Sequence, residues 1–391
     1  MKYLRIYAFI LFFSFCFLLP FGQLLRYETY IFDTFVTIHP VDIVAGLSFP
    51  YLLISKSNTY LIHLNKVILV LIFSLVFSLT IFGIKDIFVG ILYLIRVIAY
   101  FSFAHAIYYI SLGDKVKEKM ITFLFLSISL FLIIGFIQYL FYFDLRHLYF
   151  VGWDDHYFRF VSTLFDPGYT AFLLIIGLII LLEFCLPVTK YFKYILIALF
   201  IISILLTFSR AGYITLLGYF LIKYKKYFIK ILLISAAIIL VILILPKPKS
   251  SGVEIYRTFS IYSRLNNYRE TFNIFKSHPL FGIGFDNICH YKVNFLSTDN
   301  IMSHSCSGSD SSIFLLLATS GILGFVTFIN VVINVIKSPI KDSYNRMLSY
   351  LLLIILINSL FNNSLFYNYL MGVYAIIIGM GESTLILHRK V

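Results

Sequence analysis

Charged residues are scarce in this sequence. Only 13% of the 391 residues are Asp, Glu, Lys or Arg, whereas 61% are hydrophobic. A soluble domain of this length would carry far more charge on its surface, so a soluble globular fold is excluded. Apolar runs of about twenty residues recur instead, and each can cross roughly 30 Å of hydrocarbon. We expect an all-α, polytopic helical membrane protein that forms a single integral membrane domain over residues 1–391.

Motifs for nucleotide and metal chemistry are also missing. There is no Walker A motif, Rossmann fingerprint or zincin motif, and the lone Gly282-Ile283-Gly284 does not follow a strand in a βαβ unit. No carboxylate cluster has the spacing of metal ligands. The net charge of +13 does not indicate nucleic-acid binding, because most basic residues lie beside apolar runs, where they set orientation and meet anionic lipid. We expect no cofactor, no metal and no nucleic-acid partner.

The apolar runs predict about twelve membrane spans. The first is interpreted as a retained helix, because it lacks the small-residue cleavage site of a signal peptide. Lysine and arginine concentrate in alternate loops, which the positive-inside rule places in the cytoplasm together with both termini. The two long loops, 144–168 and 246–311, are then expected outside. The spans are predicted to begin near Ile6, Ile38, Val67, Ile87, Met120, Tyr169, Tyr191, Ala211, Phe228, Ser312, Met347 and Tyr369.

Cysteine is rare, with four residues in the chain. Cys16 and Cys185 fall in predicted spans and are expected to be small buried side chains. Cys289 and Cys306 both fall in the long outer loop, where the compartment permits disulfides. A bond between them would close a loop of about eighteen residues and contribute on the order of 3 kcal/mol. We therefore predict a disulfide there and regard a zinc site with the nearby His304 as a weaker alternative.

One arginine is placed unusually deep. Arg210 stands 17 residues after Lys193 and 13 before Lys223, in two spans joined by almost no loop. If both lysines mark the inner interface, Arg210 stops about 5–10 Å short of the outer surface of a core of roughly 30 Å. An arginine at that depth is costly unless it faces a water-filled cavity or a partner. The sequence predicts an anion-binding residue at the floor of an outward-facing cavity, with a snorkelling loop arginine as the alternative.

Three blocks of sequence resemble a known family. The first is Thr207-Phe-Ser-Arg-Ala-Gly212, and the second is Ser263-Arg-Leu-Asn-Asn-Tyr-Arg followed by His278-Pro-Leu-Phe-Gly-Ile-Gly284. The third runs from Ser311 to Gly324. With weaker matches at Arg159 and at Phe165-Asp-Pro-Gly168, these blocks are similar to motifs of the O-antigen polymerase and O-antigen ligase superfamily of polytopic membrane glycosyltransferases. The resemblance covers about residues 155–325.

The resemblance implies a substrate and a set of roles. Family donors are glycans on a polyprenyl pyrophosphate, whose transfer leaves negative charge on the departing phosphate. Arg210 and Arg264, with Arg159, would bind that charge, because the guanidinium fork suits phosphate oxygens and stays protonated. Asp310 is the first choice for the base that takes the acceptor proton; Asp166 and His304 are the reserves. The implied enzyme is a metal-independent glycosyltransferase in the bacterial inner membrane. Its expected partners are membrane lipid and the lipid-linked glycan, and the sequence does not decide whether a chain-length regulator protein also binds.

One departure bears on the type of enzyme. Ligase-type members usually place a His-Asn pair eleven residues before a glycine of the third block that corresponds to Gly321, whereas this chain has Asp310 and Ser311. This favours a polymerase of lipid-linked repeat units for O-antigen or a related surface polysaccharide. The alternatives are a ligase that moves glycan to lipid A-core or protein, and a flippase for lipid-linked sugar. A flippase would be expected to show two similar halves, which are not visible here.

The second block also predicts local structure. Apolar residues at Ile261, Leu265, Tyr268, Phe272 and Phe275 recur every three to four positions, as in an amphipathic helix that ends before Pro279 and lies on the outer interface. Arg264 shares a face with Tyr268, which is a substrate-binding candidate; a solvated interfacial charge is the alternative for Arg264. Asp310 has the alternative of a helix N-cap.

Two ionisable residues, Arg96 and His105, fall inside the fourth predicted span. Arg96 is a further substrate-binding candidate, because charge inside a membrane is expensive and is usually retained for function. The alternative is a structural pair with Glu183 or with an interfacial tyrosine. Asp42 is expected to be a helix-start residue.

Overall fold

The computed structural model describes residues 2–31, 34–54, 60–83, 87–151, 153–244, 251–254, 258–296, 308–336 and 343–389. Within these ranges the regular structure is helical apart from one hairpin, in which β1 (Tyr27–Ile31) pairs antiparallel with β2 (Thr34–Ile38). The prediction of an all-α polytopic membrane protein is confirmed. The helices are α1 (Lys2–Leu18), α2 (Pro40–Gly46), α3 (Pro50–Ile54), α4 (Tyr60–Ser78), α5 (Phe88–Ile110), α6 (Asp114–Phe141), α7 (Pro167–Glu183), α8 (Lys190–Leu206), α9 (Arg210–Lys223), α10 (Phe228–Ile244), α11 (Phe259–Ser277), α12 (Ile288–Tyr291), α13 (Ser312–Ile336), α14 (Ser343–Ser359) and α15 (Asn368–Arg389).

A helix, or a pair of short helices, lies over each expected span. Five helical segments within the described ranges are long and apolar enough to cross a membrane: 2–25, 61–78, 88–110, 115–141 and 312–336. The second expected span differs from the prediction of one continuous helix near Ile38. The chain there ends strand β2 and continues as the short helices α2 and α3, each of which begins at a proline. Proline lacks the backbone N–H that a continuing helix needs, so it starts a new helix instead.

Helix α7 is the centre of the bundle. Nearly all of its residues from Pro167 to Leu181 are buried, and it packs against α6, α8, α9 and α14. A helix that is apolar on every side has no solvent face and is stable only when neighbours surround it. The N-terminus of α7 is therefore held in a fixed position inside the protein.

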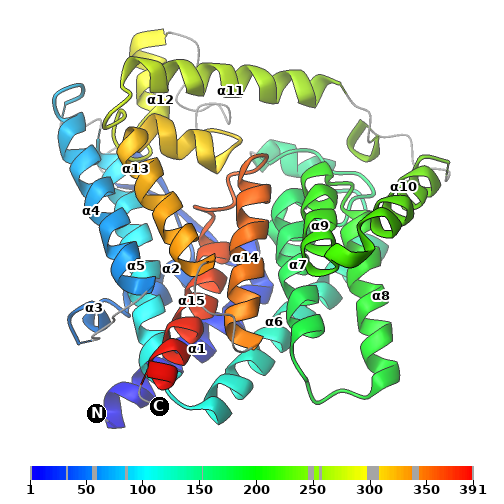
Figure 1. Cartoon of the computed structure of the whole chain (residues 1–391). Coiled ribbons are helices and arrows are strands. Elements are labelled where there is room, and N and C mark those ends of the chain that lie inside the picture. The colour runs from blue at the N-terminus through cyan, green and yellow to red at the C-terminus, as the bar shows by residue number, and fades with distance from the viewer. Residues whose placement is uncertain are drawn as a thin grey trace.

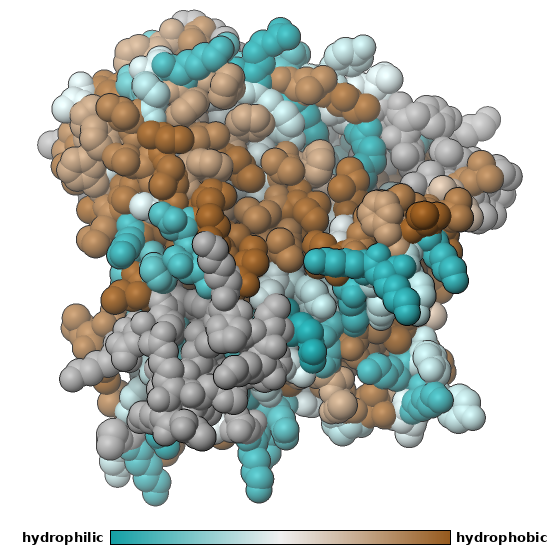
Figure 2. All heavy atoms as spheres, viewed as in Figure 1, coloured by the Kyte–Doolittle hydropathy of each residue, from teal (hydrophilic) through white to brown (hydrophobic). Residues whose placement is uncertain are grey.

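Helix α11 runs across one end of the bundle, roughly perpendicular to most other helices, and both termini lie at the opposite end (Figure 1). In the space-filling view, hydrophobic side chains dominate the middle of the molecule, and hydrophilic ones gather near α11 and again below (Figure 2). The helix ends at Ser277, as the sequence predicts. Its apolar residues Ile261, Leu265 and Phe272 remain exposed. A different stripe of the helix contacts the protein: it is polar at Arg264 and Asn267 and ends in the buried Ile274.

Candidate active site

Three helices begin beneath α11, and each has a side-chain cap. The Asp166 carboxylate accepts from the Tyr169 backbone N–H of α7 at 2.7 Å. The Ser209 hydroxyl accepts from the Gly212 N–H of α9 at 3.2 Å. In α13 the Ser311 hydroxyl accepts from the Phe314 N–H at 3.4 Å. Helix N-termini carry partial positive charge and suit anions, so this end of the bundle favours a negatively charged ligand.

The loop from Leu360 to Tyr367, between α14 and α15, joins two of these helix starts. The Ser312 hydroxyl of α13 donates to the Asn362 carbonyl at 3.1 Å. The Asn362 side chain lies directly against Gly168 of α7, where an added Cβ would come within 2.9 Å of its amide nitrogen. Sequence reasoning missed this loop. The available signal was a run of asparagine and serine between two apolar helices.

Arg210 is the first residue of α9, and a strained turn presents it. Phe208 has φ +49°, a left-handed conformation that costs a non-glycine residue on the order of 1–3 kcal/mol. Arg159, which is 6% exposed, holds this turn by donating to the Thr207 carbonyl at 3.1 Å and to the Phe208 carbonyl at 3.4 Å. The structure thus places Arg159 behind Arg210, where it positions the turn. Its role as a direct substrate ligand remains a prediction.

Arg264 reaches the same place from α11. Its Nη1 donates to the Phe361 carbonyl at 3.0 Å, and it forms no ion pair with any described residue. Arg210 approaches α11 from below and donates to the Ser260 hydroxyl at 2.5 Å. Ser260 and Arg264 are four residues apart and share a face of α11, so the two guanidinium groups lie near each other and their like charges repel. Binding an anion between them would relieve that repulsion.

Asp310 is held at this site by Asn267, a residue that sequence reasoning missed. The Asp310 backbone N–H donates to Asn267 Oδ1 at 2.9 Å, and Asn267 Nδ2 donates to the Gly308 carbonyl at 3.3 Å. Arg264 and Asn267 are three residues apart, so they share one face of α11. The helix that supplies the arginine therefore also fixes the end of the long loop.

The Asp310 carboxyl remains available for chemistry. It forms no hydrogen bond with a described residue, and the capping role considered for it is taken by Ser311. Burial raises the pKa of Asp310, whereas the positive charges of Arg264 and Lys292 lower it. A carboxylate with a raised pKa is a better proton acceptor near neutral pH than an ordinary one.

Two tyrosines, Tyr268 of α11 and Tyr169 of α7, lie near the charged side chains of this site. Tyr268 donates to the Leu360 carbonyl at 2.9 Å and packs against Phe314, so it docks α11 onto the loop before α15. Tyr169 stacks on Tyr367 with ring centroids 4.0 Å apart. The charges of Asp166, Asp310 and Arg264 all act on Tyr169. Tyr169 therefore lies among the groups that the sequence singled out, although it was not itself predicted.

Asp166 combines a structural and an electrostatic role. It caps α7, and burial raises its pKa while the nearby Arg159 guanidinium lowers it. Its carboxylate is bound by the backbone N–H of Tyr169, so it is less available than the Asp310 carboxyl. This geometry favours Asp310 over Asp166 as the proton acceptor.

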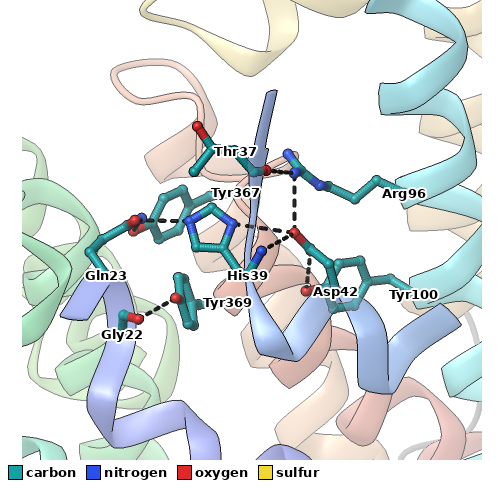
Figure 3. Close-up of polar contacts among 9 residues, drawn as sticks. All are labelled: Gly22, Gln23, Thr37, His39, Asp42, Arg96, Tyr100, Tyr367 and Tyr369. Carbon is teal, nitrogen blue, oxygen red and sulfur yellow. Dashed lines mark hydrogen bonds and ion pairs between the residues drawn. The ribbon is translucent and has the colours of Figure 1, made fainter. Parts of the chain in front are cut away.

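Arg96 belongs to a neighbouring polar network (Figure 3). It forms an ion pair with Asp42 at 3.1 Å and donates to the Thr37 carbonyl at 3.0 Å. Asp42 also forms a capping box with His39 at the start of α2, which confirms it as a helix-start residue. His39 contacts Gln23 at 2.9 Å, and Gln23 donates to the Tyr367 hydroxyl at 2.8 Å. The network therefore reaches Tyr367, on which Tyr169 stacks.

The considered pairing of Arg96 with Glu183 is wrong. Glu183 lies at the end of α7 and pairs with Lys223 at 2.6 Å and Arg346 at 3.1 Å. The alternative of a tyrosine partner is partly met, because the Arg96 guanidinium lies 5.2 Å from the centre of the Tyr93 ring. Linear sequence does not fix which carboxylate meets which cation when several helices converge, so only packing could decide it.

The structure tests the predictions for three of the four cysteines and leaves those for Cys306 and His304 untested. Cys16 is free and buried, as expected. Cys185 is free but exposed, contrary to the prediction, because α7 ends at Glu183 and leaves Cys185 in the following connection. Cys289 is disulfide-bonded. Cys306 and His304 lie outside the described residues, so the pairing of Cys289 and the reserve role of His304 stay predictions. No three His, Cys, Asp or Glu side chains in the described ranges are grouped to hold a metal ion.

Comparison with known proteins supports the resemblance found in the sequence. A family model described as O-antigen ligase matches residues 195–329, which is less than half of the chain. The matched segment contains Arg210, Arg264 and Asp310. No curated protein matches the chain. Residues 195–329 thus carry the O-antigen ligase-like domain, and the resemblance to the O-antigen polymerase and ligase superfamily is confirmed.

Proposed function

We propose that this protein polymerises lipid-linked oligosaccharide repeat units at the outer face of the bacterial inner membrane. The growing glycan on one polyprenyl pyrophosphate is transferred to the non-reducing end of a second lipid-linked unit. The product is O-antigen or a related surface polysaccharide. Both termini are then cytoplasmic, and the loops 144–168 and 246–311 face outward. The opposite placement of the termini and α11 supports this orientation (Figure 1).

The observation that carries the proposal is the pair of arginines beneath α11. Arg210 at the start of α9 donates to Ser260 of α11, and Arg264, one turn further along α11, donates to the Phe361 carbonyl beside the start of α13. A pyrophosphate is an anion that both guanidinium groups and the helix N-termini can bind together. Because negative charge on the pyrophosphate increases as the glycosidic bond breaks, these groups stabilise the transition state more than the bound donor.

The transfer step uses Asp310 on the acceptor. The acceptor hydroxyl oxygen attacks the anomeric carbon of the donor glycan, and the bond from that carbon to the pyrophosphate oxygen breaks. The hydroxyl proton passes to the Asp310 carboxylate, and polyprenyl pyrophosphate leaves with the bonding electron pair. Asn267 keeps Asp310 close to Arg264 by holding both the Asp310 N–H and the Gly308 carbonyl.

A ligase is the second candidate, and the description of the matching family model favours it. In that case the glycan moves to lipid A-core or to a protein, with the same arginines at the leaving group. Asp310 and Ser311, in place of the His-Asn pair usual in ligase-type members, favour the polymerase. A chain-length regulator protein is a candidate partner only for the polymerase. A lipid-linked sugar flippase is the least favoured, because it would be expected to carry charge along several spans, whereas Arg210, Arg264 and Asp310 gather at the α11 end of the bundle.

A deletion strain separates these functions. Loss of a polymerase leaves single repeat units attached to the cell surface, because ligation continues without polymerisation. Loss of a ligase or a flippase removes all attached glycan. Complementation with an Arg264→Ala variant at wild-type membrane abundance should fail to restore long chains. Long chains of normal length and amount in that strain would show that the arginine has no part in the reaction.

A further inference from the structure

Asp286 stands at the end of a rigid glycine turn that docks into α13. Gly282 and Gly284 have φ +69° and +88°, and an added Cβ on Gly282 would come within 2.4 Å of the Thr319 backbone. The Ile283 N–H donates to the Ala318 carbonyl at 3.0 Å, just before the kink of α13 at Gly321. The turn is therefore fixed in position by backbone contacts with a long apolar helix.

The residues on both sides of Asp286 anchor it further. Phe285 is 1% exposed and packs against Phe366, and Asn287 is fully buried and contacts Ser78 of α4 at 3.3 Å. Asp286 itself has φ +58°, a conformation that non-glycine residues adopt mainly where the surroundings impose it. Such residues gather at binding and catalytic sites. The local structure therefore fixes the direction of the Asp286 side chain.

The Asp286 carboxyl has no hydrogen-bond or ion-pair partner among the described residues. Burial raises its pKa to about 8, partly opposed by the Arg96 guanidinium, yet the residue keeps some accessible surface. The turn lies against α5, because an added Cβ on Gly90 would come within 2.4 Å of the Phe285 carbonyl oxygen and 2.8 Å of Asn287 Oδ1. Tyr93 stands one turn further along α5, and the Arg96 guanidinium lies 5.2 Å from the centre of its ring.

This turn adjoins the arginine site. Phe285 packs against Phe366, and the next residue, Tyr367, stacks on Tyr169 at the start of α7. Asp286 therefore lies on the α5 side of the loop before α15, whereas Arg264 contacts that loop from α11. The two sides differ in charge. Arg96 is already paired with Asp42, so an added Asp286 makes the α5 side unsuitable for phosphate.

We propose that Asp286, together with Arg96 and Tyr93, forms the subsite that binds the hydroxyl groups of the acceptor sugar. The inference rests on the proposed function. A carboxyl and a guanidinium accept from and donate to sugar hydroxyls, and a tyrosine ring offers an apolar face to a pyranose. The donor pyrophosphate then occupies the arginine side, and the acceptor glycan reaches Asp310 from the α5 side.

Asp286→Gly is the variant that tests this subsite. It removes the carboxyl and leaves a residue for which φ +58° carries no steric cost, so the turn should fold at least as well. Asp155→Gly, at an exposed carboxylate of the other outer loop, is the matched control. Two probes are titrated into the full-length protein in nanodiscs. One is the free repeat-unit oligosaccharide cleaved from the native surface glycan, and the other is farnesyl pyrophosphate.

We expect Asp286→Gly to weaken oligosaccharide binding at least tenfold and to change farnesyl pyrophosphate binding less than twofold. Arg264→Ala should do the reverse, and Asp155→Gly should change neither. Unchanged oligosaccharide binding in Asp286→Gly, with weakened pyrophosphate binding in Arg264→Ala, overturns the subsite and leaves the proposed function standing. Pyrophosphate binding that is insensitive to Arg264→Ala overturns the proposed function itself. If the wild-type protein binds neither probe, both fail.

Discussion

Replacing Arg264 by alanine tests the role of the arginine pair most directly. In the proposed complex Arg264 donates two charge-assisted hydrogen bonds to the pyrophosphate, each contributing about 1.5–3 kcal/mol. Arg210 remains in the variant and is freed from the repulsion that Arg264 exerts, so it compensates for part of the loss. We expect a net loss of roughly 3–4 kcal/mol in transition-state stabilisation, which is a 10²–10³-fold fall in kcat/KM.

The expected effect on folding is smaller. Arg264 makes one charge-assisted hydrogen bond to a described residue, at 3.0 Å to the Phe361 carbonyl, and such a bond contributes about 1.5–3 kcal/mol. Tyr268 and Asn267 continue to hold α11 in place through Leu360 and Gly308. A large loss of rate with a small change in thermal unfolding would therefore separate chemistry from stability.

The assay is the initial rate of glycan elongation by the full-length protein in nanodiscs, with native lipid-linked repeat units and chain length read on a gel. Arg269→Ala is the matched control, because Arg269 lies on the same helix and is exposed, and it should stay within about twofold of wild type. Arg264→Lys keeps the charge but loses the fork and should lie between the two. A rate above one third of wild type in Arg264→Ala, with unfolding unchanged, would refute the reasoning.

Three further predictions follow from neighbouring residues. Asn267→Ala should lower the elongation rate about tenfold, because Asp310 loses its 2.9 Å anchor, whereas the exposed Asn266→Ala should not; equal rates in the two variants would contradict this. Burial raises the pKa of Asp310 and Arg264 lowers it, so the elongation rate should fall as acid protonates this carboxyl. Arg264→Ala removes the lowering effect, so in that variant the fall should occur at higher pH. A pH–rate profile that does not move would argue against Asp310 as the base. Gly321→Ala should lower the free energy of unfolding by several kcal/mol, because Gly321 has φ +64° and an added Cβ would come 2.2 Å from the Leu280 carbonyl oxygen. At Gly46 an added Cβ meets nothing closer than 4.0 Å, so Gly46→Ala should cost less than about 1 kcal/mol. Thermal unfolding of the two variants measures the difference.

The sequence predicted the architecture well because a membrane constrains local composition. Each span must be apolar and must satisfy its own backbone hydrogen bonds, so the expected spans could be recognised one at a time. The amphipathic period over 261–275 likewise predicted α11, including its end before Pro279. The second span was mispredicted as continuous, because the break into α2 and α3 follows a hairpin that its apolar content did not reveal.

The site was only partly visible in the sequence. Arg210, Arg264 and Asp310 could be selected, since arginine and carboxylate are costly near a membrane and stood in motifs that resemble a family. Their support could not be selected, because Asn267 and the loop from Leu360 to Tyr367 contribute ordinary amides and backbone carbonyls. Asp286 looked like one of several loop carboxylates. Its importance arises from a left-handed backbone and from Tyr93 and Arg96, which are distant in the chain.

The sequence by itself determined that this chain is a helical membrane protein, and it predicted arginines at the outer face that would suit phosphate. The tertiary structure alone decided which side chains meet. Arg96 met Asp42 instead of Glu183, Arg159 became a support for the turn before Arg210, and Arg210 came to donate to Ser260 of α11, one turn before Arg264. The physical reason is that hydrophobicity acts residue by residue along the chain, whereas ion pairs and hydrogen bonds depend on distances of a few ångströms that only the packed bundle fixes.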